Sequence, residues 1–348
     1  MRNSVVTTEM CSKYHPDKAC DQVSDAILTE CLRLDPTSKV ACETLWKGET
    51  VVLAGEITTS AEIDYEKIVR EVADSLNYKV SEIKNLITTQ SSEIHNAVVK
   101  EDNEVGAGDQ GIMWGYACND ASTDYLPIGL WTANRVIEAI EEKVGEGVLL
   151  GDAKTQIVAN GEDITEILVS VCHSPNFSLD YVKDYIKTLL VEKGIIDENF
   201  KGLIVNPSGS WTFGGPAADC GLTGRKIVCD AYGGYAPVGG GAFSGKDPSK
   251  VDRSGAYMAR KIAVDMVNEF GLIDCSVQLS YGIGLTEPRS VRVIGRKRGI
   301  FGRVKEIDIS NEVKKRYDLT PKGIIDALGL LTLDYTKIAG GNHMKCFS

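Results

Sequence analysis

The chain has 348 residues, of which 43% are hydrophobic and 25% are charged, a composition typical of a folded globular protein. Its formal net charge of -11 at pH 7 argues against a nucleic-acid partner, because phosphate backbones are held by broad basic surfaces. Its N-terminal residues are charged where a signal peptide needs an apolar run, and no apolar stretch reaches membrane-spanning length, so we expect a cytoplasmic protein with no membrane partner.

The first clear helical pattern begins at Pro16. Apolar residues recur at helical spacing from Ala19 to Leu34, and proline suits the first position of a helix. His15 and Asp17 therefore lie at a predicted helix N-terminus, where free N–H groups and the helix dipole favour an anion. Asp17 could bring a divalent cation to that anion. Alternatively, Asp17 only complements the dipole and His15 only caps the helix.

Two alternating segments, residues 39–46 and 50–58, predict a β-hairpin. Glu43 and Glu56 are lone carboxylates in these otherwise apolar strands, where burial without a partner is costly. A buried salt bridge is the commoner explanation, and a bound cation or ligand amine is the alternative. A helix over residues 64–76 and a strand near residues 86–89 are expected next.

The polar segment over residues 90–105 has weak periodicity and predicts a loop. It runs into a glycine turn at residues 106–111, which presents Asp109 and Gln110 at the start of an apolar strand. A loop beside such a turn can close over a site and exclude water. A simple surface hairpin would explain the same pattern.

The hairpin-and-helix pattern returns twice later in the chain. We expect helices over residues 132–143, 179–193, 253–270, 310–317 and 321–328, with strands starting near 152 and over 164–172, 276–281 and 290–295. Residues 296–298, Arg-Lys-Arg, are interpreted as a solvated turn. The ten cysteines form no CxxC pair, so we expect them to be reduced and mostly buried. Together these patterns predict a three-part α+β architecture.

The most unusual stretch is Gly214–Ser254, in which ten glycines fall between Gly214 and Gly245. Glycine costs backbone entropy and packs no side chain, so this density indicates a close approach to the backbone. From residue 225 to residue 261, seven cations stand against three aspartates. Backbone N–H groups with surplus positive charge suit a polyphosphate. A flexible glycine-rich linker is the alternative.

Residues 240–246 match the first seven positions of a P-loop, but Asp247 occupies the place of the usual Ser or Thr. Pro248 follows where a helix would have to begin, and no apolar strand leads directly into the loop. We therefore predict a loop that binds phosphate without P-loop topology. Trp211, just before this region, could stack on a purine, although tryptophan is more often a core or interface residue.

Seven motifs in order resemble the S-adenosylmethionine synthetase (methionine adenosyltransferase) family: HPDK at 15–18, ACET at 41–44, GEITTS at 55–60, GAGDQG at 106–111, DAK at 152–154, GGPAADCGLTGRKI at 214–227 and GGGAFSGKDPSKVDRS at 239–254. The resemblance implies that the methionine sulfur attacks C5′ of ATP and expels triphosphate, which is then hydrolysed to pyrophosphate and phosphate. It also implies three similar α+β domains about a pseudo-threefold axis. We divide the chain into an N-terminal α+β domain (1–95), a lid and glycine turn (96–111), a central α+β domain (112–212) and a C-terminal α+β domain with the phosphate-binding loop (213–348).

The resemblance also assigns site residues, which we carry over by motif. The implied catalytic residues are His15, Lys154, Arg225, Lys226 and Lys246. The implied ATP-binding residues are His15, Asp109, Asp152, Lys154, Ser210, Trp211, Asp219, Arg225, Lys226, Ala242 and Lys246. Methionine would contact Glu56, Gln90, Asp219 and Lys250. Two Mg²⁺ ions per site would bind Asp17 and Asp252, and K⁺ would bind Glu43.

Family members are homodimers or dimers of dimers with active sites between subunits, so the resemblance implies the same here, with ATP and L-methionine as substrates. The chain departs from the usual family pattern in three pairs of residues: Lys13-Tyr14 replaces Glu-Gly, Ser92-Glu93 replaces Pro-Asp in the lid over residues 90–99, and Leu150-Gly151 replaces Arg-Pro.

Two other functions use the same phosphate site. One is a phosphotransferase or tripolyphosphatase that has lost methionine binding, but Glu56 and Gln90 argue against it because a phosphatase needs no zwitterion pocket. The other is a non-catalytic nucleotide-binding subunit, which the intact residues His15, Asp17, Lys154 and Asp252 argue against.

Overall fold

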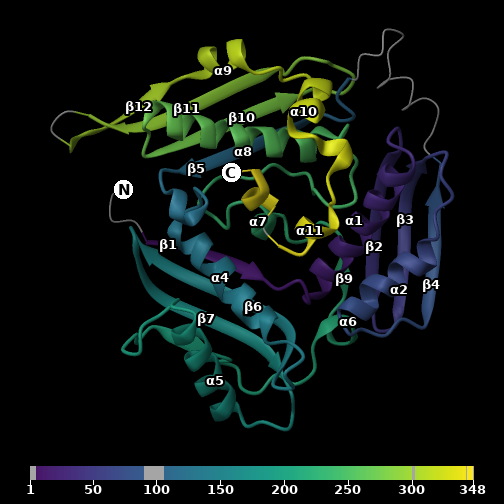
Figure 1. Cartoon of the computed structure of the whole chain (residues 1–348), viewed down its shortest axis with the longest axis vertical. Coiled ribbons are helices and arrows are strands. Elements are labelled where there is room, and N and C mark those ends of the chain that lie inside the picture. The colour runs from purple at the N-terminus through teal and green to yellow at the C-terminus, as the bar shows by residue number, and fades with distance from the viewer. Residues whose placement is uncertain (1–4, 90–105, 300–301, 342, 348) are drawn as a thin grey trace.

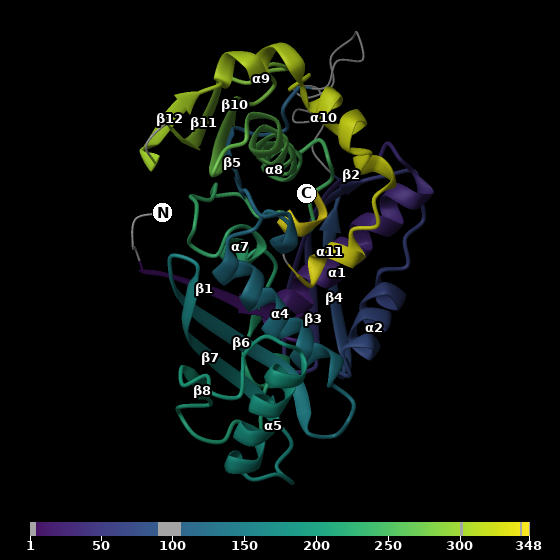
Figure 2. The same ribbon diagram turned by 60° about the vertical axis from the view of Figure 1, so that its left-hand side comes forward.

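The computed structural model describes residues 5–89, 106–299, 302–341 and 343–347. In this part of the chain the strands form three four-stranded sheets, which surround the middle of the molecule (Figure 1). Figure 2 shows the same three sheets from a second direction. Each sheet is built around one of the hairpins that the alternating sequence patterns predict.

The first sheet contains the hairpin of β2 (Lys39–Lys47) and β3 (Thr50–Thr58). β4 (Glu82–Thr88) lies parallel to β3, and β9 (Gly221–Leu222) lies antiparallel to β2 on the other side. The long helix α1 (Pro16–Leu34) packs on β2 and β9, and α2 (Tyr65–Ser75) packs against α1.

The second sheet contains the hairpin of β6 (Leu149–Asn160) and β7 (Asp163–His173). β8 (Leu203–Val205) lies parallel to β7, and β1 (Val5–Cys11) lies antiparallel to β6. Helix α4 (Ile128–Glu142) packs on β6 and β1, and α5 (Leu179–Glu192) packs on β8 and α4.

The third sheet contains the hairpin of β10 (Asp274–Tyr281) and β11 (Ser290–Arg298). β12 (Val304–Asp308) and β5 (Gly111–Cys118) lie antiparallel to β11 and β10. Helix α8 (Val251–Phe270) packs on β5 and β10, α9 (Ser310–Arg316) packs on β11, and α10 (Pro321–Leu328) packs on α8. The shorter helices are η1 (Ala121–Thr123), α6 (Gly215–Ala218), α7 (Ile227–Asp230), η3 (Leu330–Thr332), α11 (Thr336–Ala339) and η4 (His343–Phe347).

The three sheets repeat one plan, which confirms the predicted three-part α+β architecture. Each combines a hairpin, an outer strand and a long inner helix, and each is completed by a strand from elsewhere in the chain, namely β9, β1 or β5. β4 runs parallel to β3 and β8 runs parallel to β7, because α2 and α5 provide the crossover between the paired strands. β12 instead follows β11 without an intervening helix and is antiparallel to it. The added strands come from outside the sequence range of each hairpin, and the division into residues 1–95, 96–111, 112–212 and 213–348 stays a prediction.

The interpretation of Arg296–Arg298 as a solvated turn is wrong. All three residues belong to β11 and pair with β12, a strand that the sequence pattern did not reveal. Arg296 Nε donates to Asp274 Oδ1 of the neighbouring strand β10 at 2.7 Å, and Lys297 Nζ donates to the Phe270 carbonyl at 2.6 Å.

The cysteines behave as expected. All ten are free thiols, and eight of them are buried, which fits their use as small apolar residues. The helices in the described ranges include none that is long and apolar enough to cross a membrane.

Candidate functional site

Three aspartates on α1, namely Asp17, Asp21 and Asp25, are spaced four residues apart and therefore share one face of the helix. The side chains of all three are fully buried. Each carboxylate accepts a backbone N–H from the glycine-rich stretch: Leu222 donates to Asp17 at 3.0 Å, Gly224 to Asp21 at 2.8 Å and Gly245 to Asp25 at 2.8 Å. The glycine-rich stretch is thus anchored along α1, which contradicts the flexible-linker alternative.

Each buried carboxylate of this aspartate row also has a cationic partner. Arg253, itself fully buried, donates to both oxygens of Asp25 at 2.7 and 2.6 Å. Lys18 Nζ lies 3.0 Å from Asp21 Oδ2. Asp17 has two partners: Arg225 Nε lies 3.2 Å from Oδ1, and Lys226 Nζ bonds Oδ2. Sequence reasoning missed Lys18, Asp21, Asp25 and Arg253, although the i, i+4, i+8 spacing of the aspartates was visible.

His15 is the N-cap of α1, and its Nδ1 accepts the N–H of Asp17 at 3.1 Å. The predicted helix start and the capping role are therefore confirmed. Burial, together with the positive charges of Lys226 and Lys154, lowers the pKa of His15 to about 3. The imidazole is neutral at pH 7, and because Nδ1 is the acceptor, Nε2 carries the proton.

Asp17 remains ionised despite its burial. Burial by itself would raise its pKa, but the Lys226 ammonium and the Leu222 N–H lower the pKa below its ordinary value. The carboxylate therefore keeps its negative charge beside the neutral ring of His15.

Asp152, on β6, is a further buried carboxylate, and its pKa responds to the charges of Lys154 and Asp219, as that of His15 does. Its Oδ2 accepts the N–H of Gly215 at 2.7 Å, while Oδ1 has no hydrogen-bond partner among the residues that the structure describes. Burial raises the pKa of Asp152 to about 6, and the charges of Asp219 and Asp17 add to this rise. Asp152 thus retains one acceptor oxygen for a ligand.

We call the residues around His15 group A. The group consists of His15, Asp17 and Asp152, the residues whose charges shift the pKa values of these three, and Arg225, which pairs with Asp17. Besides the three themselves, its members are Lys154, Asp219, Lys226 and Arg225. Lys154, Asp219 and Arg225 are exposed. Ser210 and Trp211 precede Gly214, where a Cβ would lie 3.1 Å from Asp152 Oδ2. The Trp211 indole N–H donates to the Phe213 carbonyl at 2.8 Å.

A second group, which we call group B, surrounds Lys246. Lys246 Nζ donates to Asp252 Oδ2 at 2.6 Å, and Lys250 pairs with Asp247. The glycine turn at residues 106–111 lies beside them, because a Cβ on Gly108 would lie 3.9 Å from the Lys250 side chain and a Cβ on Gly111 would lie 2.9 Å from Asp252 Oδ1. Group B therefore contains Ala242, Lys246, Lys250, Asp252 and the turn residue Asp109.

Two glycines beside group B, Gly241 and Gly245, explain part of the glycine density. A Cβ on Gly241 would lie 2.1 Å from the Asp252 carboxylate carbon, and a Cβ on Gly245 would lie 2.0 Å from the Cys42 carbonyl oxygen. Gly245 also has a φ of +81°, a conformation that side chains disfavour. The expected close approach to the backbone is confirmed, and here it is made by the protein's own carboxylate and carbonyl groups.

Glu43 and Glu56 are exposed on the outer face of the first sheet, so the commoner explanation of a buried salt bridge is wrong for both. Strand alternation decides this, because the inward positions of β2 and β3 are occupied by apolar residues and by Thr44, whose hydroxyl bonds that of Ser24 on α1. Glu56 lies opposite Ala41 in the ladder, and Ala41 in turn forms a bridge with Lys246. The Lys246 charge also acts on Glu43, where it opposes the rise in pKa that desolvation causes, so both glutamates border group B. Gln90 and residues 96–105 of the predicted lid lie outside the described residues.

Groups A and B are neighbours along α1. They are anchored at Asp17 and Asp25, which are eight residues apart, or about 12 Å along the helix axis. They adjoin at Ala242, whose Cβ lies 2.5 Å from where a Cβ on Gly224 would be. One chain thus presents two adjacent clusters, each with a carboxylate and at least one lysine.

Within the described ranges, no three His, Cys, Asp or Glu side chains are grouped so as to hold a metal ion. Asp17 and Asp252 instead each bind a lysine ammonium, which shows that each carboxylate is placed to hold a cation. Mg²⁺ commonly binds one or two carboxylates together with phosphate oxygens and water. Asp17 in group A and Asp252 in group B therefore each fit a Mg²⁺ ion that is also bound to a polyphosphate.

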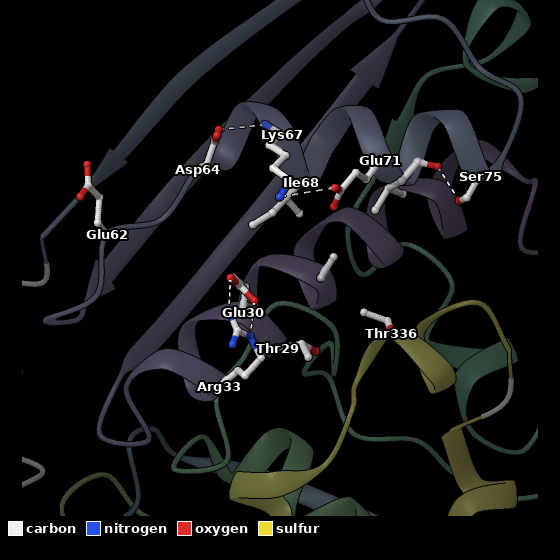
Figure 3. Close-up of a pocket in the computed structure, with 12 residues that line it drawn as sticks. Thr29, Glu30, Arg33, Glu62, Asp64, Lys67, Ile68, Glu71, Ser75 and Thr336 are labelled. Carbon is white, nitrogen blue, oxygen red and sulfur yellow. Dashed lines mark hydrogen bonds and ion pairs between the residues drawn. The ribbon is translucent and has the colours of Figure 1, made fainter.

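A separate open groove of about 550 Å³ lies between α1 and α2 (Figure 3). It contains none of the predicted site residues. Both of its cationic side chains pair with carboxylates of the groove, Arg33 with Glu30 at 2.7 Å and Lys67 with Glu71 at 3.8 Å. The groove therefore gives no sign of a particular ligand.

Comparison with known proteins places these groups in context. Models of the N-terminal, central and C-terminal domains of S-adenosylmethionine synthetase match residues 3–102, 104–211 and 213–346. The S-adenosylmethionine synthase of Helicobacter hepaticus is 39% identical to this chain, over 98% of this chain and 93% of the relative. That of Brachyspira hyodysenteriae is 40% identical, over 99% of this chain and 93% of the relative. The chain belongs to the S-adenosylmethionine synthetase family.

A solved structure agrees with this membership. The chain is similar to an S-adenosylmethionine synthetase from Campylobacter jejuni, with a TM-score of 0.86 and 29% identity over 100% of this chain and 97% of that one. The predicted family and the α+β fold of S-adenosylmethionine synthetases are confirmed, as is the prediction that the chain is an ATP-binding transferase.

Proposed function

We propose that the chain forms S-adenosylmethionine from L-methionine and ATP, by attack of the methionine sulfur on C5′, and then hydrolyses the released triphosphate to pyrophosphate and phosphate. The observation that carries this proposal is the aspartate row of α1, which holds the glycine-rich backbone so that Lys226 lies beside a neutral His15 at the Asp17 end and Lys246 follows the amide bound at the Asp25 end. The family relatives named above support the same activity.

The first step needs positioning and leaving-group stabilisation rather than a general base, because a thioether sulfur has a lone pair and no proton to lose. His15 suits this requirement. Its ring is neutral and its Nε2 carries the proton, so it would donate a hydrogen bond to the departing O5′ oxygen. Lys154, Arg225, Lys226 and Lys246 would bind the phosphate oxygens that gain charge as the bond breaks.

The remaining contacts follow the chemistry of the substrates. Asp109, Asp152, Ser210, Trp211 and Ala242 would complete the ATP site, with Trp211 beside adenine and the free Asp152 oxygen accepting a donor. For methionine, the carboxylates of Glu56 and Asp219 suit its ammonium group and Lys250 suits its carboxylate. Gln90 would join them.

Two Mg²⁺ ions would be held by Asp17 and Asp252, and K⁺ by Glu43. When bound, these cations would offset the negative charge of the triphosphate. Until then, the ammonium groups of Lys226 and Lys246 balance Asp17 and Asp252, and the arriving phosphates would draw both lysines toward themselves.

We further propose a homodimer, or a dimer of dimers, in which group A of one subunit faces group B of the other, and a cytoplasmic location. The separation of the two groups along α1 supports an active site shared between subunits. Both Mg²⁺ ions would bind one triphosphate, whereas within one chain the Asp17 and Asp252 carboxylates belong to different groups. Analytical ultracentrifugation would test the assembly, and a monomer with full activity would refute it.

One incubation tests the activity. The protein is supplied with ATP, Mg²⁺ and K⁺, with and without methionine, and the sulfonium product, phosphate and pyrophosphate are measured. Methionine-dependent formation of S-adenosylmethionine is expected. Phosphate release that ignores methionine would favour a tripolyphosphatase, and tight ATP binding without turnover would favour a non-catalytic subunit.

A further inference from the structure

The loop between β1 and α1, residues 12–14, delivers His15 to group A and is held from several directions. Ser12 anchors it to β6: the Ser12 N–H donates to the Ala153 carbonyl at 3.0 Å, and the Ser12 hydroxyl donates to the Gly151 carbonyl at 2.7 Å. These bonds fix the start of the loop but leave Lys13 and Tyr14 to be held by other partners.

Glu141, in the last turn of α4, holds the next residue. Its Oε1 accepts the backbone N–H of Lys13 at 2.6 Å. The Lys13 carbonyl in turn accepts a hydrogen bond from Gln22 Nε2 at 2.7 Å. Both polar groups of the Lys13 peptide backbone are thus engaged by side chains, two residues before His15.

Tyr14 is held by packing and by its own backbone. Its side chain is 6% exposed, and a Cβ on Gly151 would lie 2.5 Å from the ring. Gly151 has a φ of +97°, so the position is closed to side chains both by space and by conformation. The Tyr78 hydroxyl donates to the Tyr14 carbonyl. The two positions in contact, 14 and 151, are also among the departures from the usual family pattern.

We propose that Glu141 is a positioning residue for His15, and that the packing of Tyr14 on Gly151 holds the same loop from its other side. This inference rests on the proposed function, in which His15 donates a hydrogen bond to the departing oxygen. Glu141 does not touch the substrate. It acts by keeping the Lys13 peptide in the orientation that aims the imidazole into group A.

The surroundings of Glu141 give this role a measurable signature. Burial raises the pKa of Glu141 to about 7, while the Lys13 N–H and the Lys13 and Lys18 charges oppose the rise and Glu138 adds to it. Lys337 and Lys345 line the same cavity of about 200 Å³, and Lys345 pairs with Glu138. The strength of the hydrogen bond from Lys13 should therefore fall as the pH drops through 7, because a carboxylate accepts more strongly than a carboxylic acid.

Three variants test the proposal in the full-length protein. Glu141→Leu removes the acceptor, Glu141→Gln keeps an acceptor oxygen but cannot titrate, and Glu138→Gln is the matched control on the same helix and cavity. Steady-state kinetics from pH 6 to pH 8.5 would give kcat and the KM values for ATP and methionine. Thermal unfolding of each variant would report whether the fold is intact.

Misplacement of a catalytic group by about 1 Å can cost about 100-fold in rate, so we expect Glu141→Leu to lower kcat by about 10- to 100-fold with smaller changes in KM. Glu141→Gln should stay near the wild-type kcat at pH 8 and lose the decline of kcat below pH 7. Glu138→Gln should keep the wild-type kcat at pH 8, and because Glu138 adds to the rise in the pKa of Glu141, the decline of its kcat should begin at a lower pH. A Glu141→Leu enzyme with wild-type kcat would overturn the proposal. An unchanged pH profile of kcat in Glu141→Gln would also overturn it, and this second variant decides the question if Glu141→Leu fails to fold.

A second measurement separates this proposal from the proposed function. If the wild type forms no S-adenosylmethionine, the function fails, but the long-range ¹H–¹⁵N spectrum of the four histidines still reports on His15. Glu141→Leu should shift the His15 ring signals while leaving those of His173 and His343 in place. Unchanged His15 signals would refute the positioning role.

Discussion

Removal of Arg253 is the sharpest test of the aspartate row. The guanidinium is fully buried, donates to both oxygens of Asp25 at 2.7 and 2.6 Å, and also donates to the Lys246 carbonyl at 3.2 Å and the Tyr257 hydroxyl at 2.9 Å. Arg253→Met would leave the Asp25 carboxylate buried without its counter-charge. Breaking a buried pair in this way costs about 3–5 kcal/mol, a large part of the roughly 5–15 kcal/mol that stabilises a typical protein.

The double variant Arg253→Met/Asp25→Asn separates charge from packing. It removes the unpaired charge, while the amide oxygen introduced at position 25 can still accept the Gly245 N–H, so we expect it to recover about half of the loss. Lys261→Met, on the same helix, removes a partly exposed pair with Asp265 and should cost less than about 1 kcal/mol.

Urea unfolding followed by circular dichroism would measure these changes, with turnover measured in parallel. We expect turnover of Arg253→Met to fall as well, because Arg253 and Asp25 hold the backbone on both sides of Lys246. A loss below about 1 kcal/mol in Arg253→Met would refute the reasoning. So would a double variant that is no more stable than Arg253→Met.

Three further predictions concern the two groups and the loop between β1 and α1. Lys246→Met should lower kcat by about 10²- to 10³-fold, as expected for loss of one charge-stabilising group, whereas Lys322→Met, an exposed pair on α10, should not. The pKa of His15 is lowered to about 3 in the folded protein, so below pH 6.5 the unfolded chain binds a proton that the folded chain does not, and the free energy of unfolding falls as the pH falls. His15→Asn should remove roughly 2 kcal/mol of the stability that the wild type loses between pH 7 and pH 5. Urea unfolding at the two pH values would measure this difference. Gly151→Ala should destabilise the protein by about 1–3 kcal/mol through overpacking on Tyr14, and Tyr14→Ala should reduce that penalty in the double variant, measured by thermal unfolding.

Each of these predictions has a result that contradicts it. Near-normal turnover in Lys246→Met would remove that lysine from the phosphate site. Equal acid sensitivity of wild type and His15→Asn would mean that the ring is protonated in the folded protein at pH 5. Strict additivity of the Gly151 and Tyr14 substitutions would show that the two residues do not interact.

Local patterns in the amino-acid sequence were sufficient for the hairpins, for the long helices and for much of the chemistry, but not for β1 or β12. The start of α1 at Pro16, the hairpins and the long helices all follow from periodicity and from residues that favour particular backbone conformations, because such signals act over a few neighbouring residues. The density of glycine likewise indicated a close approach to the backbone, since glycine is selected where a Cβ has no room. The motif resemblance identified the family on the same local basis.

The tertiary structure alone decided which distant segments meet. β1, β5 and β9 each complete the sheet of a hairpin far away in the chain, and the aspartate row of α1 binds amides about 200 residues later. The outward position of Glu43 and the hold of Glu141 on Lys13 belong to the same category. Periodicity records how each segment divides its side chains between core and solvent, but it contains no information on the partner, because many strands and helices could cover the same apolar face. Which segments pack together is fixed in part by buried ion pairs, such as that of Asp25 with Arg253. These pairs form between residues far apart in the sequence and are therefore seen only in the folded chain.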